Sequence, residues 1–324
     1  MDVAATRTLG RTAVEVTRLA LGCAPLGGLF RTVTEVDAQG TIEAAWDAGV
    51  RTFDVAPQYG LGRAEQRLGT ALRGYARSDY VVSTKIGRLV VAPGRGDEGT
   101  GLFADAPAAE LAFDFSRDGV RRSLEASLER LGLDRVDILH VHDPDDHLDQ
   151  AIAEAVPALC ELRDEGVIGA VGAGMNYAAP LERIVRESDV DCVLVAGRYT
   201  VLDNESAVGL LSECESRGVS VLAAGVFNSG VLADPRPGAT FDYRPVPEPM
   251  LARARAIGEV CGAAGVPLTA AAMRFPLGHP AVACVLVGAR SADEVRANAA
   301  AFVADVPPAL WDSLRAAGLL ADPG

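Results

Sequence analysis

The sequence predicts a (β/α)8 TIM barrel of the α/β class with an N-terminal β-hairpin, and three observations support this fold. Short apolar runs typical of buried parallel strands alternate with amphipathic segments along most of the chain. Glycine follows several predicted helices, where it commonly ends a helix. The main alternative, a doubly wound dinucleotide-binding sheet, has Gly-x-Gly-x-x-Gly after its first strand, whereas Gly22, Gly27 and Gly28 have a different spacing.

The chain begins with a short hairpin over residues 6–17, where Leu9-Gly10-Arg11 separates two alternating runs. Strand-like runs follow over 18–22, 50–54, 80–85, 136–142, 167–172, 191–195, 219–224 and 282–287. Helical segments follow most of them, over 36–48, 63–73, 117–131, 148–165, 177–187, 204–217 and 291–302. The helical period is clear where Leu124, Leu128 and Leu131 fall on one face.

Glycines and two long irregular stretches mark the ends of these elements. Glycine lies between a helical segment and a strand-like run at Gly49, Gly132, Gly166, Gly218 and Gly265. Residues 87–115 and 227–247 are rich in Gly, Pro and Ala and follow strand ends. Barrel enzymes hold their active sites on that face, so we expect functional loops there. No segment of linker composition divides the chain, and we expect one domain over residues 1–324.

Composition and charge exclude several classes of function. The net charge of −14 argues against nucleic acid and anionic membrane surfaces as partners. Six scattered cysteines without a Cys-x-x-Cys pair indicate reduced thiols and a cytoplasmic location. The first residues show no apolar signal-peptide segment, and no apolar run approaches the ~18 residues of a membrane helix.

Lysine occurs once in this chain, at Lys85, and all the other cations among its 30 Lys and Arg residues are arginines. Arginine is larger, planar and always charged, so it does not easily replace a buried amine that tunes a neighbouring group. Lys85 ends the β-branched run that starts at Tyr80, and lysine is rarely buried without a reason. We therefore expect a chemical role for Lys85; the alternative is a surface lysine left by codon bias.

Polar residues end three successive predicted strands. Asp54 closes the second strand and Tyr59 follows in its loop. Lys85 closes the third strand, and His142 closes the fourth. Neighbouring strands lie ~4.8 Å apart, so these four side chains can converge at one mouth of the barrel.

These four residue types suit acid–base chemistry on a carbonyl. A lysine cation close to a phenol favours the phenolate and lowers the pKa of Tyr59. Asp54 can keep Lys85 protonated and orient it, and His142 can donate a hydrogen bond to a carbonyl oxygen. Taken singly, Asp54 could cap a helix, and Tyr59 and His142 could be packed core residues. Their joint placement instead predicts a site that interconverts C=O and CH–OH.

Two other chemistries, a metal site and a Schiff base, are alternatives to this acid–base chemistry. His140 and His142 share one face of a strand, a metal-ligand spacing of barrel hydrolases. A metal site needs further ligands. Of the other two histidines, His147 follows Asp145-Asp146 in a polar loop, and His279 lies far from any other candidate ligand. We expect no metal, although a metal-dependent hydrolase stays an alternative. Schiff-base chemistry would need a neutral Lys85, which the nearby acid disfavours.

Three segments resemble the aldo-keto reductase superfamily: Phe53-Asp54-Val55-Ala56-Pro57-Gln58-Tyr59-Gly60, Ser83-Thr84-Lys85 and Val141-His142-Asp143-Pro144. The resemblance runs from about residue 7 to about residue 302. Residues 113–120 and 196–200 are similar to the branch that includes D-threo-aldose 1-dehydrogenase, L-fucose dehydrogenase and pyridoxal 4-dehydrogenase. The resemblance implies a barrel that is closed at the bottom by the hairpin. It also implies that this barrel binds a nicotinamide cofactor without a Rossmann fold. It also implies that Tyr59 is the general acid/base, tuned by Lys85 and Asp54, and that His142 orients the substrate oxygen.

The same resemblance implies a set of cofactor contacts. Asn176 would bind the nicotinamide carboxamide, and Tyr199 would stack on the nicotinamide ring. The pyrophosphate would be wrapped by Gly225-Val226-Phe227-Asn228-Ser229-Gly230, and the adenosine end would be held by Gly288, Arg290 and Asn298. Two positions depart from the family pattern: Met175 or Gly174 replaces the usual Ser, and Ala196 replaces the usual Gln.

The cofactor is expected to be NAD(P), with a preference for NAD. Many members of the superfamily place a Lys at the Gly288 position and an Arg at the Glu294 position, where both hold the 2′-phosphate of NADP. Gly288 and Glu294 remove these charges, and Glu294 would repel the phosphate. Arg290 keeps one positive charge in the segment.

We therefore expect a cytoplasmic NAD(P)-dependent oxidoreductase that interconverts a carbonyl, or a sugar lactol and lactone, with an alcohol by hydride transfer. The expected partner is a small polar carbonyl or sugar such as an aldose, because the chain lacks an aromatic-rich C-terminal tail: after residue 302 only Val303-Ala304-Asp305 and a short helix around Trp311 follow. A non-catalytic nicotinamide-binding redox module is a further alternative. The sequence does not predict the oligomeric state.

Overall fold

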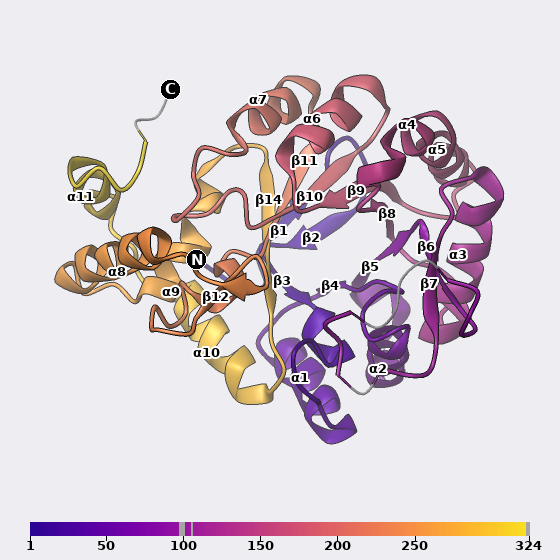
Figure 1. Cartoon of the computed structure of the whole chain (residues 1–324), viewed down its shortest axis with the longest axis horizontal. Helices are drawn as coiled ribbons and strands as arrows, with labels where there is room; N and C mark the ends of the chain where they lie inside the picture. The colour runs from indigo at the N-terminus through magenta and orange to yellow at the C-terminus, as the bar shows by residue number, and fades with distance from the viewer. Residues whose placement is uncertain (97–100, 105, 322–324) are drawn as a thin grey trace.

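The computed structural model describes residues 1–96, 101–104 and 106–321. Within these residues, eight parallel strands close into a barrel with helices around it (Figure 1). Around the barrel the strands are β3 (Leu19–Gly22), β4 (Thr52–Asp54), β5 (Val81–Ile86), β8 (Ile138–His142), β9 (Ala170–Met175), β10 (Cys192–Ala196), β11 (Ser220–Ala224) and β14 (Val282–Gly288), which pairs with β3. The predicted (β/α)8 barrel is confirmed.

The N-terminal hairpin closes one end of the barrel. Strands β1 (Thr6–Thr8) and β2 (Glu15–Thr17) pair antiparallel, as expected. Leu9 and Val16 from this hairpin are fully buried against apolar residues inside the barrel, among them Ile138. The loops that follow the strands lie at the opposite end of the barrel, where the carboxyl ends of the strands are.

The helices form a ring outside the barrel, with a further group on one side (Figure 1). The ring contains α1 (Glu35–Asp47), α2 (Arg63–Leu72), α3 (Arg117–Leu131), α4 (Leu148–Gln150), α5 (Val156–Asp164), α6 (Ala178–Glu187), α7 (Val208–Arg217) and α10 (Ala292–Val303). The group at one side contains α8 (Glu248–Ala263), α9 (Leu268–Arg274) and α11 (Ala309–Ala316). Residues such as Leu251, Ile257 and Leu314 give this group an apolar cluster of its own.

The expected boundaries hold for most elements and shift at a few. The helix expected over 148–165 contains a π-helical turn, Ala151–Ala155, in which Val156 donates to the carbonyl of Ala151. Pro157 has no N–H to continue the α-helical pattern there, which explains the wider turn. The expected strand at 167–172 instead spans residues 170–175.

Some elements were not expected from the sequence. Helices α8 and α9 had no predicted counterpart, and Gly265 lies between these helices rather than before a strand. The stretch 87–115 contains the hairpin β6 (Arg88–Val91) and β7 (Glu110–Phe113), although its residues 97–100 and 105 lie outside the described residues. The stretch 227–247 contains the hairpin β12 (Thr240–Phe241) and β13 (Arg244–Pro245).

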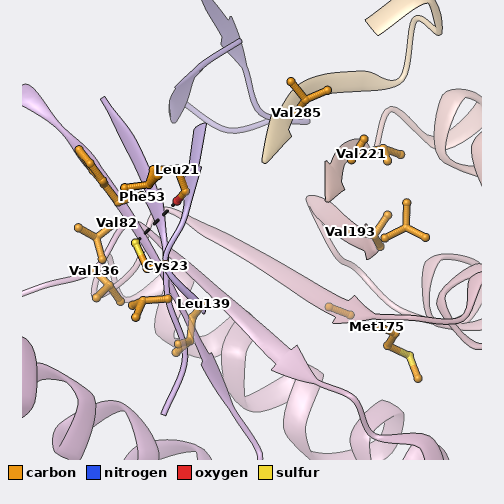
Figure 2. Packing of buried hydrophobic residues seen from close by; sticks show 14 of the residues in the cluster. Leu21, Cys23, Phe53, Val82, Val136, Leu139, Met175, Val193, Val221 and Val285 are labelled. Atoms are coloured by element: carbon orange, nitrogen blue, oxygen red, sulfur yellow. Dashed lines mark hydrogen bonds between the residues drawn. The ribbon is translucent and has the colours of Figure 1, made fainter. Parts of the chain in front are cut away.

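The strands place one set of apolar side chains between the barrel and the helices, whereas Asp54 and Lys85 lie on the inner face of the barrel. Leu21, Phe53 and Val82 come from adjacent strands and belong to the apolar layer between barrel and helices (Figure 2). Successive side chains of a strand point to opposite faces. Asp54 and Lys85 alternate with that layer and therefore point into the barrel.

Helix α2, which follows Tyr59 along the chain, packs closely on the end of α3. A Cβ at Gly69 would lie 1.8 Å from the carbonyl oxygen of Leu131. We expect Gly69→Ala to lower the free energy of unfolding by about 1–3 kcal/mol, because the backbone must move. Gly40→Ala in α1 is the matched control: a Cβ there meets nothing within 4 Å, so it should add about 0.5–1 kcal/mol. Urea unfolding measures both, and equal effects would contradict this packing.

Within the described residues, no single helix has both the length and the apolar composition needed to cross a membrane. Helix α8 and residues 268–278 have the necessary length and apolar composition only when they are taken together, and the two are bent by 102° relative to each other.

Candidate active site

Asp54, Tyr59, Lys85 and His142 lie together at the ends of β4, β5 and β8, as the sequence predicted. The Lys85 Nζ donates to Asp54 Oδ2 at 2.8 Å, to the carbonyl oxygen of Val55 at 2.9 Å and to the Tyr59 hydroxyl at 3.2 Å. The rings of Tyr59 and His142 are perpendicular, with centroids 5.9 Å apart. The phenol, the ammonium and the imidazole therefore share one small volume.

Burial and hydrogen bonding fix the Lys85 side chain. Lys85 is 1% exposed, and its contacts with Asp54, Val55 and Tyr59 match the three donors of an ammonium group. The other carboxylate oxygen of Asp54 accepts from the Ser83 hydroxyl at 2.9 Å. A group so completely bonded has a single position, which favours a precise electrostatic role.

Electrostatics keep Lys85 charged and Tyr59 protonated. Burial by itself lowers the pKa of Lys85, but Asp54 and Tyr59 outweigh it and raise that pKa above its ordinary value. Burial raises the pKa of Tyr59, and the nearby Lys85 opposes this rise without overcoming it. The expected effect of Lys85 is present, but the expectation of a lowered Tyr59 pKa is wrong for this enclosed site. Tyr59 thus carries a proton that it can donate.

The imidazole of His142 is held in its neutral form. Burial lowers its pKa well below the ordinary value, and Lys85 and Arg88 lower it further. Its Nε2 lies 3.6 Å from Asp143 Oδ2. Within the described residues its Nδ1 is buried without a hydrogen-bond partner.

The four residues lie in a cavity of about 970 Å³ that opens between the loops after the strands. Most of the residues predicted to contact the cofactor line the same cavity: Asn176, Gly225, Val226, Phe227, Asn228, Ser229, Gly230, Gly288, Arg290 and Asn298. Asn228 Oδ1 and Arg290 Nε are buried polar atoms that have no hydrogen-bond partner in the described part of the chain. A long cavity with unsatisfied polar atoms fits an extended polar cofactor such as a dinucleotide.

Tyr199 differs from its expected place. It is not among the residues that line the cavity. Its ring packs instead against Phe275, at a centroid distance of 5.2 Å, and against the edge of His279 at 6.0 Å. The sequence analysis did not predict α9, and so it did not anticipate that Tyr199 would pack against Phe275, directly after that helix. Stacking of Tyr199 on the nicotinamide stays a prediction.

Glu294 has a structural role that the sequence analysis missed. The side chain of Ser291 accepts from the Glu294 N–H at 3.2 Å, and Glu294 Oε2 accepts from the Arg290 N–H at 2.9 Å. Arg31 also approaches Glu294 Oε1 at 3.5 Å. The Ser-x-x-Glu spacing of a capping box was the signal that could have revealed this arrangement.

Tyr243, Asp143 and Phe30 also line the cavity and were not singled out as site residues. Asp143 appeared only as part of the Val141–Pro144 motif. Tyr243 lies on the β12–β13 hairpin, so only the folding of residues 227–247 brings it over the strand ends.

Among the described residues, His140 belongs to no group of side chains that is placed to hold a metal ion. His140 is fully buried inside the barrel, and a Cβ at Gly172 would lie 2.2 Å from its Nδ1. Neither ring nitrogen of His140 has a hydrogen-bond partner among the described residues. Across residues 1–96, 101–104 and 106–321, no group of three or more His, Cys, Asp or Glu side chains is placed to hold a metal ion.

A parallel barrel with a buried Asp–Lys–Tyr group and a histidine at the base of a long cavity defines a class of oxidoreductases that act on carbonyl and alcohol groups. The chain belongs to the aldo/keto reductase family, whose model matches residues 18–318. As a member of this family it is an NAD(P)-dependent enzyme.

Individual relatives agree with this membership. The chain is 42% identical to pyridoxal 4-dehydrogenase of Microbacterium luteolum, over 97% of each chain. It is 41% identical to D-threo-aldose 1-dehydrogenase of a Pseudomonas species, over 94% of this chain and 95% of that one. Among solved structures, the holo form of an aldo-keto reductase from Bacillus halodurans superposes with a TM-score of 0.75 at 25% identity, covering 96% of this chain and 95% of that one.

Proposed function

We propose that this enzyme oxidises the lactol of an aldose, or reduces the corresponding carbonyl of a small polar substrate, with Tyr59, Lys85, Asp54 and His142 as its catalytic group. The observation that carries the proposal is the triple hydrogen bonding of Lys85 beside the Tyr59 hydroxyl. The named relatives act on small polar molecules: pyridoxal, D-threo-aldoses and, at 35% identity, L-galactose in Arabidopsis thaliana.

Each residue has a defined part in the proposed reaction. The nicotinamide cofactor supplies or accepts the hydride. In reduction, Tyr59 donates its proton to the substrate oxygen, and Lys85 stabilises the phenolate that results. His142 donates a hydrogen bond to the same oxygen, and Asp54 keeps the ammonium charged and in place. In oxidation, Tyr59 first releases its proton to solvent, and the phenolate, stabilised by Lys85, then receives the proton of the substrate hydroxyl.

We infer that residues 1–324 act as one catalytic domain and that the enzyme works in the cytoplasm. The six cysteines are all free thiols, and most are buried. Unpaired buried thiols suit a reducing compartment.

We propose NAD rather than NADP as the preferred cofactor. The Glu294 carboxylate lies beside Arg290 at the start of α10, with its Oε2 3.7 Å from Arg290 Nε. The Glu294 carboxylate accepts from the Arg290 N–H just before α10 and lies beside the Arg290 guanidinium. Both of these donors would otherwise attract a 2′-phosphate. A phosphate placed there would meet a like charge.

Glu294→Gln should therefore raise kcat/KM with NADP by about tenfold and change kcat/KM with NAD little, because it removes the like charge and keeps the shape of the cap. Asp293→Asn is the matched control, because the Asp293 side chain is 94% exposed. Its kcat/KM with each cofactor should equal that of the wild type. Steady-state kinetics with both cofactors measure this. A wild-type enzyme that strongly prefers NADP would contradict the proposal.

The proposed reaction is tested by an oxidation screen over aldoses with NAD and a reduction screen over small aldehydes with NADH. Turnover in either screen is expected. If the purified enzyme binds NADH, measured by fluorescence titration, and turns over none of these substrates, the proposal fails.

A further inference from the structure

Backbone strain in this protein gathers at the cavity. Seven non-glycine residues in the described part of the chain have positive φ: Phe30, Leu61, Asp143, Asn228, Ser229, Asp242 and Tyr243. All of them except Leu61 line the cavity. Such conformations cost of order 1–3 kcal/mol each and persist where the surroundings require them.

Tyr243 is the least expected residue in this set. It forms, with Asp242, the two-residue turn between β12 and β13, and the two φ angles are +61° and +48°. A two-residue hairpin turn with both φ positive strongly favours Asp-Gly or Asn-Gly. Asp242 fits this rule, but the second position should be glycine, because a bulky side chain is strained there. Retaining a tyrosine indicates that its side chain has a use.

The turn is held in place on both sides. Arg198 donates to the two carboxylate oxygens of Asp242 at 3.0 and 2.5 Å. The Tyr243 N–H donates to Ser229 Oγ at 3.3 Å, and the Thr240 hydroxyl donates to the carbonyl oxygen of Ser229 at 2.8 Å. These contacts orient Tyr243 over the cavity.

The Tyr243 phenol reaches towards the catalytic group. The residue is 45% exposed as a whole, and its ring meets that of Phe30 at a centroid distance of 5.8 Å. Burial nevertheless raises the pKa of its hydroxyl, Asp143 raises it further, and Lys85 lowers it. Tyr243 lines the same cavity as Asp143 and Lys85, so its phenol borders the space in which a substrate would lie.

Asp143 stands next to the place of the reacting oxygen. It follows His142 directly, and its Oδ2 lies 3.6 Å from His142 Nε2. The Arg88 Nη2 lies 3.3 Å from the same carboxylate oxygen. This ion pair restricts the position of the Asp143 side chain. A carboxylate has about four acceptor positions, so one such group can hold a guanidinium and accept a hydrogen bond from a substrate hydroxyl at the same time.

We propose that Tyr243 and Asp143 form a recognition site for a hydroxyl on the carbon next to the reacting carbon, so that the preferred substrates are 2-hydroxy aldehydes and aldoses. This inference rests on the proposed function. A carboxylate accepts from a hydroxyl and a phenol can donate to it. A site with buried polar groups rejects an analogue that lacks the hydroxyl, because those groups are left unpaired.

The test compares substrate pairs that differ only in this hydroxyl. L-galactose and 2-deoxy-L-galactose are oxidised with NAD, and lactaldehyde and propanal are reduced with NADH. The readout is the ratio of kcat/KM within each pair. For the wild type we expect a ratio of at least about tenfold in favour of the hydroxylated member. Tyr243→Phe, Tyr243→Gly and Asp143→Asn should each lower that ratio about tenfold, mainly through KM.

Two further measurements separate recognition from structure. Tyr243→Gly should keep or raise the Tm, since glycine relieves the positive φ of the turn. Tyr177→Phe is the matched control, because Tyr177 is 56% exposed, lies near Arg198 and does not line the cavity; its ratio should equal that of the wild type.

The outcomes are distinct. A wild-type ratio near one, or ratios unchanged in Tyr243→Phe and Tyr243→Gly, would overturn the recognition site while turnover itself supports the proposed function. A lowered Tm in Tyr243→Gly would overturn the argument from strain. No turnover of any member of either pair by the wild type would instead count against the proposed function.

Discussion

Tyr59→Phe is expected to lower kcat about 10²–10⁴-fold, the usual contribution of a positioned general acid. The variant keeps the ring, which packs against His142 at 5.9 Å, and removes only the hydroxyl that lies 3.2 Å from Lys85 Nζ. With no group in place to move the proton, the substrate oxygen must exchange it with water. Steady-state kinetics in both directions measure the loss.

Cofactor binding separates this result from a folding defect. NADH titration, followed by fluorescence, should give a Kd close to that of the wild type, because Tyr59 lies at the substrate end of the cavity. The Tm should fall slightly, since one N–H of Lys85 loses its acceptor. Tyr177→Phe again serves as the control for removing a phenol oxygen. Unchanged turnover in Tyr59→Phe would rule out the proposed mechanism.

The barrel and the convergence of the proposed catalytic residues were predictable because their signals are local. Strand-like runs and helix-ending glycines such as Gly132 and Gly218 carry the fold one unit at a time. Asp54, Lys85 and His142 each end a strand, and the parallel arrangement of the strands alone brings such ends together. The strand pairings therefore converted three separate positions into one site.

The remaining features depend on contacts that no local pattern encodes. Tyr199 does not line the cavity. Its ring packs instead against Phe275, which comes from a segment more than seventy residues later. Tyr243 lines the cavity, and contacts with Arg198 and Ser229, both distant from it in the sequence, hold its hairpin turn there. The Tyr59 pKa was misjudged for a related reason: the cation was visible in the sequence, but the degree of burial was not.

Lys85→Met is expected to be the most destabilising of the single substitutions at this site. The Asp54 and Lys85 side chains are 4% and 1% exposed. Removal of the ammonium leaves a buried carboxylate without its counter-ion, which should cost about 3–5 kcal/mol of unfolding free energy. The double variant Asp54→Asn/Lys85→Met removes both charges and should recover most of that loss, because no uncompensated charge stays buried. Urea unfolding of the two variants measures the difference.

Activity should not follow stability in this pair. Both variants lack the cation that stabilises the Tyr59 phenolate, so turnover should stay at least about 10²-fold below the wild type even where the fold recovers. Recovery of activity together with stability in the double variant would mean that Lys85 is only structural.

Lys85→Arg tests whether a positive charge at this position is sufficient for turnover. Arginine retains the positive charge, but its planar guanidinium is larger than an ammonium and presents its donors in a fixed fork. The three acceptors around Lys85, which are Asp54 Oδ2, the Val55 carbonyl oxygen and the Tyr59 hydroxyl, converge on one point. A fork cannot reach all three from a fully buried position without displacing Tyr59. We therefore expect a loss of kcat of about 10²-fold or more in Lys85→Arg, with NADH binding retained. Near-normal kcat in this variant would show that any cation serves at this position and that nothing in the chemistry requires the chain's only lysine.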